Sequence, residues 1–411
     1  MTPIPLQMPL TAFRNVAIDV LVGAALGFCI GQSPITVQFL LFMPLYWFCT
    51  RRRLDAWLFA FVYYLVAARG LPSGASVFFG SIYPLEFSYF LYIGSSFALS
   101  LPWALVWKPL SRFGMKGVIV SALRLLCVFI ILTVVPLGLF GWASPIQAAG
   151  WIFKGWGFFG IAAFCFITSA LAYALTFNKI PCFVLLAISI NFLCSRASEI
   201  PNFFENIEVL DTVYGKLASG SSDIVDATIR SGGLYKRILD VHTSSYILTP
   251  ETVVGPWVKA TKQYWQPVIA VLKKRGQSVI IGSEEYDKNF MYDNTLRILG
   301  ADSGVYRQRF PVPISMWRPF GGVGTAKAHW LDSGLMQLSD GRLAVCLVCY
   351  EQYLPLPVFM SLAMAPRKPD LIIAAENHWW SRQTYLPAAA RQSLTSWAML
   401  FNLPFVCAKN I

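Results

Sequence analysis

The chain has 411 residues, of which 56% are hydrophobic and 13% are charged, and its mean hydropathy is +0.55. Because a soluble domain carries roughly twice that share of charge, the composition excludes a single water-soluble globule, a disordered chain and a disulfide-rich secreted scaffold. The net charge of +12 comes from scattered basic residues that flank apolar segments. This distribution favours contact with phospholipid headgroups over binding of nucleic acid.

Acidic residues divide the chain into two parts. Before Glu199 the chain holds three acids, which are Asp19, Asp55 and Glu86. We therefore predict a multi-pass transmembrane helical domain over residues 1–197 and a water-facing domain over residues 198–411.

The first part contains stretches that are long and apolar enough to cross a membrane, and we predict about seven or eight spans. The seven candidates are Val16–Ile30, Ile35–Thr50, Leu54–Ala68, Phe87–Trp107, Val118–Phe140, Gly157–Phe177 and Pro181–Cys194. Phe78–Pro84 and Gly141–Phe153 are candidates for an eighth span or a re-entrant segment. Trp and Tyr gather near the ends of the candidates, as is typical of the boundary between lipid and water.

Lys and Arg predict the orientation, because short cytoplasmic loops carry an excess of these residues. If the N-terminus is cytoplasmic, the outer loops hold only Arg69 and Lys154. The inner loops then hold Arg14, Arg51, Arg52, Arg53, Lys108, Arg112, Lys116 and Lys179. Seven spans place the water-facing domain outside the cytoplasm, whereas an even number reverses this placement or flips the N-terminus.

In the second part, short apolar runs alternate with helical stretches. The runs predict buried strands at Ser245–Leu248, Ser278–Ile281, Leu343–Val348, Asp370–Ala374 and Phe405–Ala408. The helical stretches are Asp223–Asp240, Trp257–Arg275, Pro355–Met364 and Pro387–Phe401. This alternation predicts an α/β sandwich.

Two residues with reactive side chains follow predicted strands, namely Glu251 and Cys349. Strand ends that lead into loops are where α/β proteins place reactive groups. A cysteine needs a base to become a thiolate nucleophile, and a carboxylate can be that base if burial raises its pKa. Each residue also has a plainer interpretation: Cys349 as a buried core residue and Glu251 as an acid at a helix N-terminus.

Other candidate sites are weaker. The three His residues lack the spacing of a metal site, so we predict no metal centre. Gly321–Ala326 is glycine-rich like a phosphate-binding loop, but no strand leads into it and no Gly-Lys-Ser/Thr follows. We therefore interpret it as a flexible loop.

Seven segments, taken in order, resemble the nitrilase superfamily of carbon–nitrogen hydrolases. They are Leu248–Glu251, Ile280–Ser283, Tyr292–Asn294, Tyr306–Pro313, Val348–Glu351, Glu376–Trp380 and Ala408–Asn410. With a polytopic membrane part in front, the chain resembles apolipoprotein N-acyltransferase and the related TraB family of conjugal transfer proteins. This resemblance implies a polytopic α-helical membrane domain followed by a nitrilase-type αββα sandwich.

The resemblance also implies roles for individual residues. Glu251 takes the place of the general base, Cys349 that of the nucleophile, and Glu351 that of an acid that supports the site. The residues expected to shape the substrate pocket are Tyr350, Asn377, Trp379 and Trp380. In such enzymes the thiolate attacks an acyl donor and forms a thioester, which passes its acyl group to an amine or to water, without a cofactor.

One departure from the family concerns the Lys that stabilises the tetrahedral oxyanion. Gln308 stands in its column, and Arg309 or Arg307 could supply the charge only by a shift of register. In a strand, both Arg side chains would point to the face opposite Gln308. The acid expected shortly after Pro313 is also absent, since Met316 and Trp317 stand there.

We therefore predict a Cys-dependent acyltransferase or amidase in the bacterial inner membrane, with its soluble domain on the periplasmic side. Its expected partners are a phospholipid or other acyl donor, an amine-bearing protein such as a lipoprotein or pilin, and proteins of the conjugation apparatus, but not nucleic acid. The alternative is a catalytically silent membrane scaffold of that apparatus, which Gln308 and the missing second acid favour.

Overall fold

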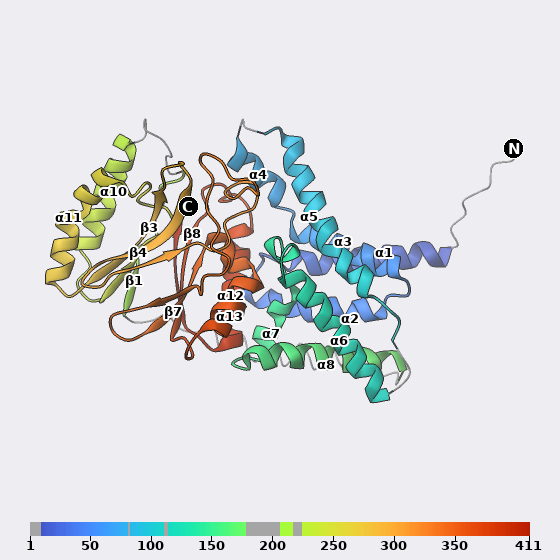
Figure 1. Ribbon diagram of the computed structural model, residues 1–411. Helices are drawn as coiled ribbons and strands as arrows, with labels where there is room; N and C mark the ends of the chain where they lie inside the picture. Colours follow the sequence, from blue (N-terminus) through green and yellow to red (C-terminus); the bar gives the residue numbers. More distant parts are fainter. Residues whose placement is uncertain (1–9, 81–82, 111–113, 178–205, 217–223) are drawn as a thin grey trace.

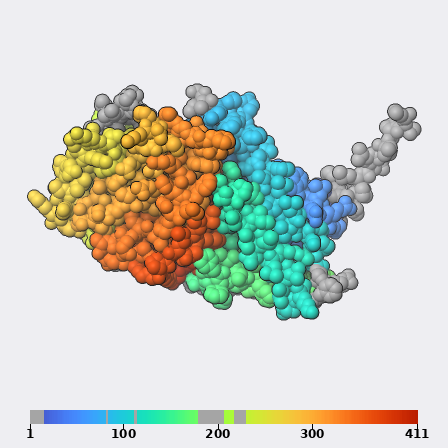
Figure 2. Space-filling view, viewed as in Figure 1, coloured from blue at the N-terminus to red at the C-terminus, as the bar shows by residue number. Residues whose placement is uncertain are grey.

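The computed structural model describes residues 10–80, 83–110, 114–177, 206–216 and 224–411. Figure 1 shows a helical part formed by the first half of the chain and, beside it, an α/β part formed by the second half. The two parts have a broad common boundary, which Figure 2 also shows.

The helical part consists of apolar helices joined by short loops. Its α-helices are α1 (Leu10–Phe28), α2 (Phe42–Cys49), α3 (Arg53–Ala67), α4 (Leu71–Phe79), α5 (Leu85–Val106), α6 (Gly114–Thr133), α7 (Ala148–Ile152) and α8 (Gly157–Phe177). Its 3₁₀ helices are η1 (Pro34–Leu41), η2 (Leu137–Leu139) and η3 (Pro145–Gln147).

Three of the described helices, α5, α6 and α8, are long and apolar enough to cross a membrane. The pair α3 and α4, bent by 50°, raises the number to four if it counts as one span. The predicted spans Val16–Ile30 and Ile35–Thr50 correspond to α1 and to η1 with α2, which contain shorter apolar helices. The candidate Pro181–Cys194 lies outside the described residues.

The segment Gly141–Phe153, a candidate for a re-entrant piece, folds into η3 and α7 and is buried in the protein. Irregular backbone at membrane depth is tolerated where protein rather than lipid surrounds it. A GxxxG pair brings α1 against α3: a Cβ at Gly23 would lie 2.6 Å from Phe59 O, and one at Gly27 would lie 2.4 Å from Tyr63 O. Small residues at this spacing allow the two backbones to touch.

The α/β part contains two sheets. The first sheet has the order β1 (Ile207–Val209), β2 (Tyr246–Leu248), β3 (Ser278–Tyr286), β4 (Tyr292–Gly300) and β5 (Gly304–Arg307). The second has the order β6 (Leu335–Gln337), β7 (Leu343–Val348), β8 (Leu371–Asn377) and β9 (Phe405–Asn410). The helices are α10 (Ile224–Leu239), α11 (Lys259–Lys274), η5 (Cys349–Tyr353), α12 (Pro355–Met364) and α13 (Leu386–Phe401).

Alternation along the buried strands determines how the layers pack. In β8, Leu371, Ile373 and Ala375 face the core between the two sheets, whereas Ile372 and Ala374 face the core under α12 and α13. Side chains of a strand point to opposite faces in turn, so a strand covered on both sides is apolar throughout. With α10 and α11 over the first sheet, the layers form the predicted αββα sandwich (Figure 1).

Helix α13 joins the two parts of the molecule. One hydrophobic core extends from the membrane helices through α13 to β7 and β8. Gln392 of α13 receives a hydrogen bond from Gly31 N at 2.7 Å and donates to Thr36 Oγ1 at 2.9 Å and Cys29 O at 3.0 Å. A Cβ at Gly150 in α7 would lie 2.1 Å from Ser396 O, so the two helices are in direct contact.

Candidate active site

The structure brings the predicted base and nucleophile together. Glu251 follows β2, and Cys349 begins η5 directly after β7. The two residues therefore come from the ends of strands in different sheets. Their side chains interact electrostatically, since each of them changes the pKa of the other. They are 4% and 7% exposed, respectively, so the pair is almost fully shielded from solvent.

The surroundings of the pair change the proton affinity of both groups. Burial raises the pKa of Glu251 to about 7. Interactions with Asn294, Cys349 and His378 lower this pKa, but their effect is smaller than that of burial. Burial also raises the pKa of the Cys349 thiol well above its usual range, and the Glu251 carboxylate adds to that rise. The backbone of Asn377 lowers the pKa of this thiol and so acts in the opposite direction. A carboxylate with a pKa near neutrality is suited to general base catalysis.

The loops that carry Glu251 and Cys349 each contain a residue in the left-handed backbone region. Cys349 has φ of +47°, and Thr252, directly after Glu251, has φ of +52°. Such a conformation costs on the order of 1–3 kcal/mol for a residue with a side chain. The surrounding structure therefore stabilises an unfavourable backbone conformation in both loops, next to the two side chains of the pair.

Asn294 of β4 connects Glu251 to Gln308. Its Nδ2 donates to Glu251 Oε1 at 2.6 Å and to Gln308 Oε1 at 3.0 Å. Gln308 in turn donates from Nε2 to Val348 O at 3.1 Å, next to Cys349. Gln308 is 1% exposed, so its neutral amide lies in the candidate site, in the column where the resembled family has Lys.

Glu351 holds the segments on either side of the site. Its Oε1 accepts backbone N–H groups of Arg309 at 2.8 Å and Phe310 at 3.1 Å, and its Oε2 accepts Tyr306 Oη at 2.6 Å and Val348 N at 2.8 Å. The side chain is fully buried. This single carboxylate therefore fixes the position of the Gln308 segment relative to the strand that presents Cys349.

The basic residues near the Gln308 segment are engaged elsewhere. The Arg309 guanidinium, fully buried, donates from Nη2 to Pro357 O at 2.9 Å. Arg307 Nε and Lys327 Nζ lie 3.8 and 3.0 Å from Asp293 Oδ2. The structure thus brings Arg309 close to Glu351 but directs its charge away from the candidate nucleophile.

Asn377 and Tyr350, which the resemblance assigns to the substrate pocket, lie close to the pair. Asn377 follows Glu376 at the end of β8, and its Nδ2 donates to Thr252 Oγ1 at 3.2 Å. Tyr350 Oη donates to Leu139 O of the membrane part at 2.8 Å. The loop that carries the thiol is therefore tied directly to the helical part.

Trp379 and Trp380 pack on α4 of the helical part. The Trp379 ring stacks on Phe78 with 5.7 Å between centroids, and Lys216 Nζ lies 5.3 Å from its centroid. A Cβ at Gly74 would lie 2.6 Å from the Trp380 ring. These contacts place the loop after β8 against the membrane helices.

Two residues near the pair, Asn294 and His378, have roles that the sequence alone does not reveal. Asn294 belongs to a segment that resembles the nitrilase family, but only the paired strands β3 and β4 show that it reaches Glu251. His378 is 1% exposed, and its Nε2 lies 3.0 Å from Glu376 Oε2 while its Nδ1 lies 3.1 Å from Ser381 Oγ. Histidine spacing alone could not predict this buried pair.

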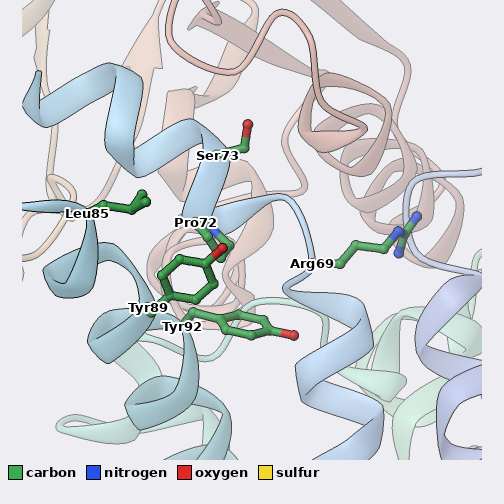
Figure 3. A pocket seen from close by; sticks show the side chains of 6 residues that line it. All are labelled: Arg69, Pro72, Ser73, Leu85, Tyr89 and Tyr92. Atoms are coloured by element: carbon green, nitrogen blue, oxygen red, sulfur yellow. The ribbon is translucent and has the colours of Figure 1, made fainter.

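Figure 3 shows a separate hollow of about 310 Å³ in the helical part. It is lined by Arg69, Pro72, Ser73, Leu85, Tyr89 and Tyr92. The Arg69 guanidinium points away from the hollow (Figure 3) and lies over the Tyr385 ring, 3.8 Å from its centroid. Among the described residues, no group of three or more His, Cys, Asp or Glu side chains is placed to hold a metal ion.

Gly282 gives a first prediction. A Cβ at this position in β3 would lie 2.2 Å from Pro250 O and 2.7 Å from the Cα of Glu251. We expect Gly282→Ala to displace the base by a fraction of an ångström and to slow alkylation of Cys349 by iodoacetamide. Gly304→Ala, where the nearest atom is the flexible Ile298 side chain at 3.2 Å, is the matched control. Equal rates in both variants would contradict the prediction.

The fold and the site define a protein with helices long and apolar enough to cross a membrane and an αββα domain that brings together a buried cysteine and a buried glutamate. The chain is 32% identical over 394 residues to the probable conjugal transfer protein TraB of Sinorhizobium fredii (strain NBRC 101917 / NGR234), covering 92% of each chain. It is 28% identical over 414 residues to the conjugal transfer protein TraB of Agrobacterium fabrum (strain C58 / ATCC 33970), covering 96% of this chain and 93% of the other. The chain belongs to the TraB family of conjugal transfer proteins.

Solved structures similar to the α/β part include a carbon–nitrogen hydrolase from Helicobacter pylori G27, with 14% identity and a TM-score of 0.35 over 50% of this chain and 73% of that chain. The amidase from Nesterenkonia sp. AN1 is similar at 15% identity and a TM-score of 0.31, over 50% of this chain and 78% of that chain. No family model matches the sequence.

Proposed function

We propose that this protein is a membrane-bound Cys-dependent acyltransferase or amidase that acts in conjugative plasmid transfer, on the maturation of a pilus or of the transfer apparatus. The observation that carries the proposal is the buried pair formed by the Cys349 thiol and the Glu251 carboxyl group, each of which changes the pKa of the other. The membrane part and the TraB relationship supply the setting. The excess of Lys and Arg in the loops assigned to the cytoplasm supports a periplasmic α/β domain.

In the first half of the proposed reaction, Glu251 takes the proton of the Cys349 thiol while the sulfur attacks an acyl carbonyl carbon. The tetrahedral adduct carries its negative charge on the former carbonyl oxygen. The Gln308 amide is the proposed donor to that oxygen. Collapse of the adduct breaks the bond to the leaving alcohol or amine, which receives the proton from Glu251, and leaves an acyl thioester on Cys349.

In the second half, an amine or a water molecule attacks the thioester and gives its proton to Glu251. The sulfur then leaves and recovers that proton, so the free enzyme is restored and an amide or a free acid is released. A site that touches α4 and η2 of the membrane part suits an acyl donor that stays in the bilayer.

A catalytically silent scaffold is the second candidate, and Gln308 is the observation that favours it. A neutral amide replaces the family's cation, and Arg307, Arg309 and Lys327 are paired with other groups. One preorganised hydrogen-bond donor to the oxyanion commonly lowers the activation free energy by about 3–4 kcal/mol. A family member without that donor could retain the fold and lose the activity.

Trapping of the thioester distinguishes the two candidates. The full chain is reconstituted in vesicles of phosphatidylethanolamine and phosphatidylglycerol, and the peptide that contains Cys349 is examined by mass spectrometry. We expect an added acyl mass that neutral hydroxylamine removes. Cys407, which is partly buried and lies away from Glu251, should stay unmodified. An unmodified Cys349 in every lipid mixture, with and without an added amine, would favour the scaffold.

The pH dependence of Cys349 alkylation tests the proposed base. Because the pKa of Glu251 is raised to about 7, the basic carboxylate is scarce below that pH. The rate should therefore rise as pH increases through neutrality, instead of being constant above pH 5. The electrostatic effect of His378 lowers the pKa of Glu251, so His378→Gln should move this rise to higher pH. An unchanged profile in His378→Gln would show that the histidine is only structural.

A further inference from the structure

The α/β part exposes a group of large apolar side chains that have no role in the proposed active site. Phe320 is 102% exposed and Val323 is 76% exposed, both in the glycine-rich loop between β5 and β6. Phe290, at the turn between β3 and β4, is 65% exposed. Gly324 N donates to Phe290 O at 2.8 Å, so the loop and the turn form one surface. We call Phe290, Phe320 and Val323 the apolar tip.

The base of the glycine-rich loop is anchored toward the membrane part. Trp317 and Trp330 contact each other with 5.2 Å between ring centroids. Both are partly buried against the core that the membrane helices and α13 share. In Figure 2 the orange surface that includes this region meets the blue surface of α4 and α5.

The neighbouring helices already present an apolar surface to lipid. Val77 of α4 is 52% exposed, and Phe90 of α5, a helix long enough to span the membrane, is 70% exposed. Both helices therefore expose large apolar side chains of the kind that a bilayer covers, as the apolar tip also does. In water, these large apolar side chains would be exposed to solvent. Soluble domains rarely expose large contiguous apolar patches.

The charges of the loop suit a lipid headgroup layer. Residues 318–327 contain Arg318 and Lys327 but no acid, and Lys327 is paired with Asp293 and Asp287. Exposed Arg318 lies two residues from Phe320. Aromatic and basic side chains side by side are typical of segments that rest in the membrane interface, where the ring enters the acyl boundary and the cation stays among phosphates.

We propose that the apolar tip lies in the headgroup region of the bilayer that the helical part spans, so that the α/β part has a second, peripheral contact with lipid. This contact is directly linked to the candidate site. The loop begins after the Gln308–Phe310 segment and returns through a hydrogen bond from His329 N to Arg309 O at 3.2 Å. The inference does not depend on catalysis by Cys349.

Photocrosslinking from the tip tests this placement. Phe320 is replaced by p-benzoylphenylalanine in the full chain, which is reconstituted in vesicles of phosphatidylethanolamine and phosphatidylglycerol and irradiated. We expect a phospholipid adduct on the peptide that contains position 320. Because Phe320 is fully exposed, the larger aromatic group should not disturb packing.

Two matched positions calibrate the experiment. Phe90 on α5 should give the same adduct, whereas Ile229, which is 68% exposed on α10, should give none. Figure 1 places α10 at the end of the molecule farthest from the helical part. A result in which position 320 behaves like 229 while position 90 crosslinks to lipid would overturn the proposal and leave the tip as a surface for a protein partner.

Discussion

Cys349→Ala is expected to reduce plasmid transfer to the level of a strain that lacks the protein, while the amount of protein in the membrane stays unchanged. The thiol is the proposed nucleophile, and loss of a covalent nucleophile lowers kcat on the order of a million-fold in serine hydrolases. The substitution removes one sulfur atom from a buried site and leaves the hydrogen bonds of Glu351 intact. Mating frequency and immunoblotting of the membrane fraction measure the two quantities.

Cys346→Ala is the matched control for this variant. Cys346 lies in β7 three residues before Cys349 and is fully buried between the sheets, but its strand position keeps it in the core. Transfer should persist in that variant. Glu251→Gln should reproduce the loss seen in Cys349→Ala, because an amide cannot accept the thiol proton. Full transfer from Cys349→Ala would exclude the enzyme and leave the scaffold.

Glu351→Gln is expected to destabilise the α/β part by about 3 kcal/mol. The carboxylate accepts from three backbone N–H groups and from Tyr306 Oη. In the amide, one of the two oxygens becomes an NH₂ group that faces donors, and buried Arg309 loses its counter-charge 3.9 Å away. The melting temperature of the full chain in detergent measures the effect.

Glu285→Gln is the control for charge removal, since its ion pair with Arg297 at 2.8 Å is partly exposed and such pairs contribute about 0–1 kcal/mol. If Glu351→Gln fails to accumulate, Tyr306→Phe removes one of the same hydrogen bonds and should give a smaller but measurable decrease. Equal melting temperatures for Glu351→Gln and Glu285→Gln would show that the hydrogen-bond network contributes little.

Much of the fold could be predicted from the sequence because burial leaves a strong signal. Strands β7 and β8 are covered on both faces, so they stand out as uninterrupted apolar runs, and α12 was predicted with the bounds that the structure shows. Strands β4 and β5 were not predicted. Their sequences, Tyr292–Gly300 and Gly304–Arg307, mix polar and apolar residues, and pairing with β3 stabilises them.

The candidate site was predictable only in part. The positions of Glu251 and Cys349 at strand ends follow from local sequence, but their contact depends on how two separate sheets pack. The same holds for Gln308, which reaches the site through Asn294 of a strand that the sequence did not reveal. The direction of the Arg309 side chain depends on carbonyl groups from distant loops, and no spacing rule contains that information.

The burial of α13 on both sides has a practical and a biological consequence. Cutting the chain after α8 would expose the apolar surface around Leu394 and Trp397, so a separate C-terminal fragment should aggregate. In the cell, the same anchorage would keep the Cys349 thiol at a constant height above the lipid. Partners of this site would then be found by diffusion in the plane of the membrane. A soluble macromolecule would first have to be brought to the membrane surface.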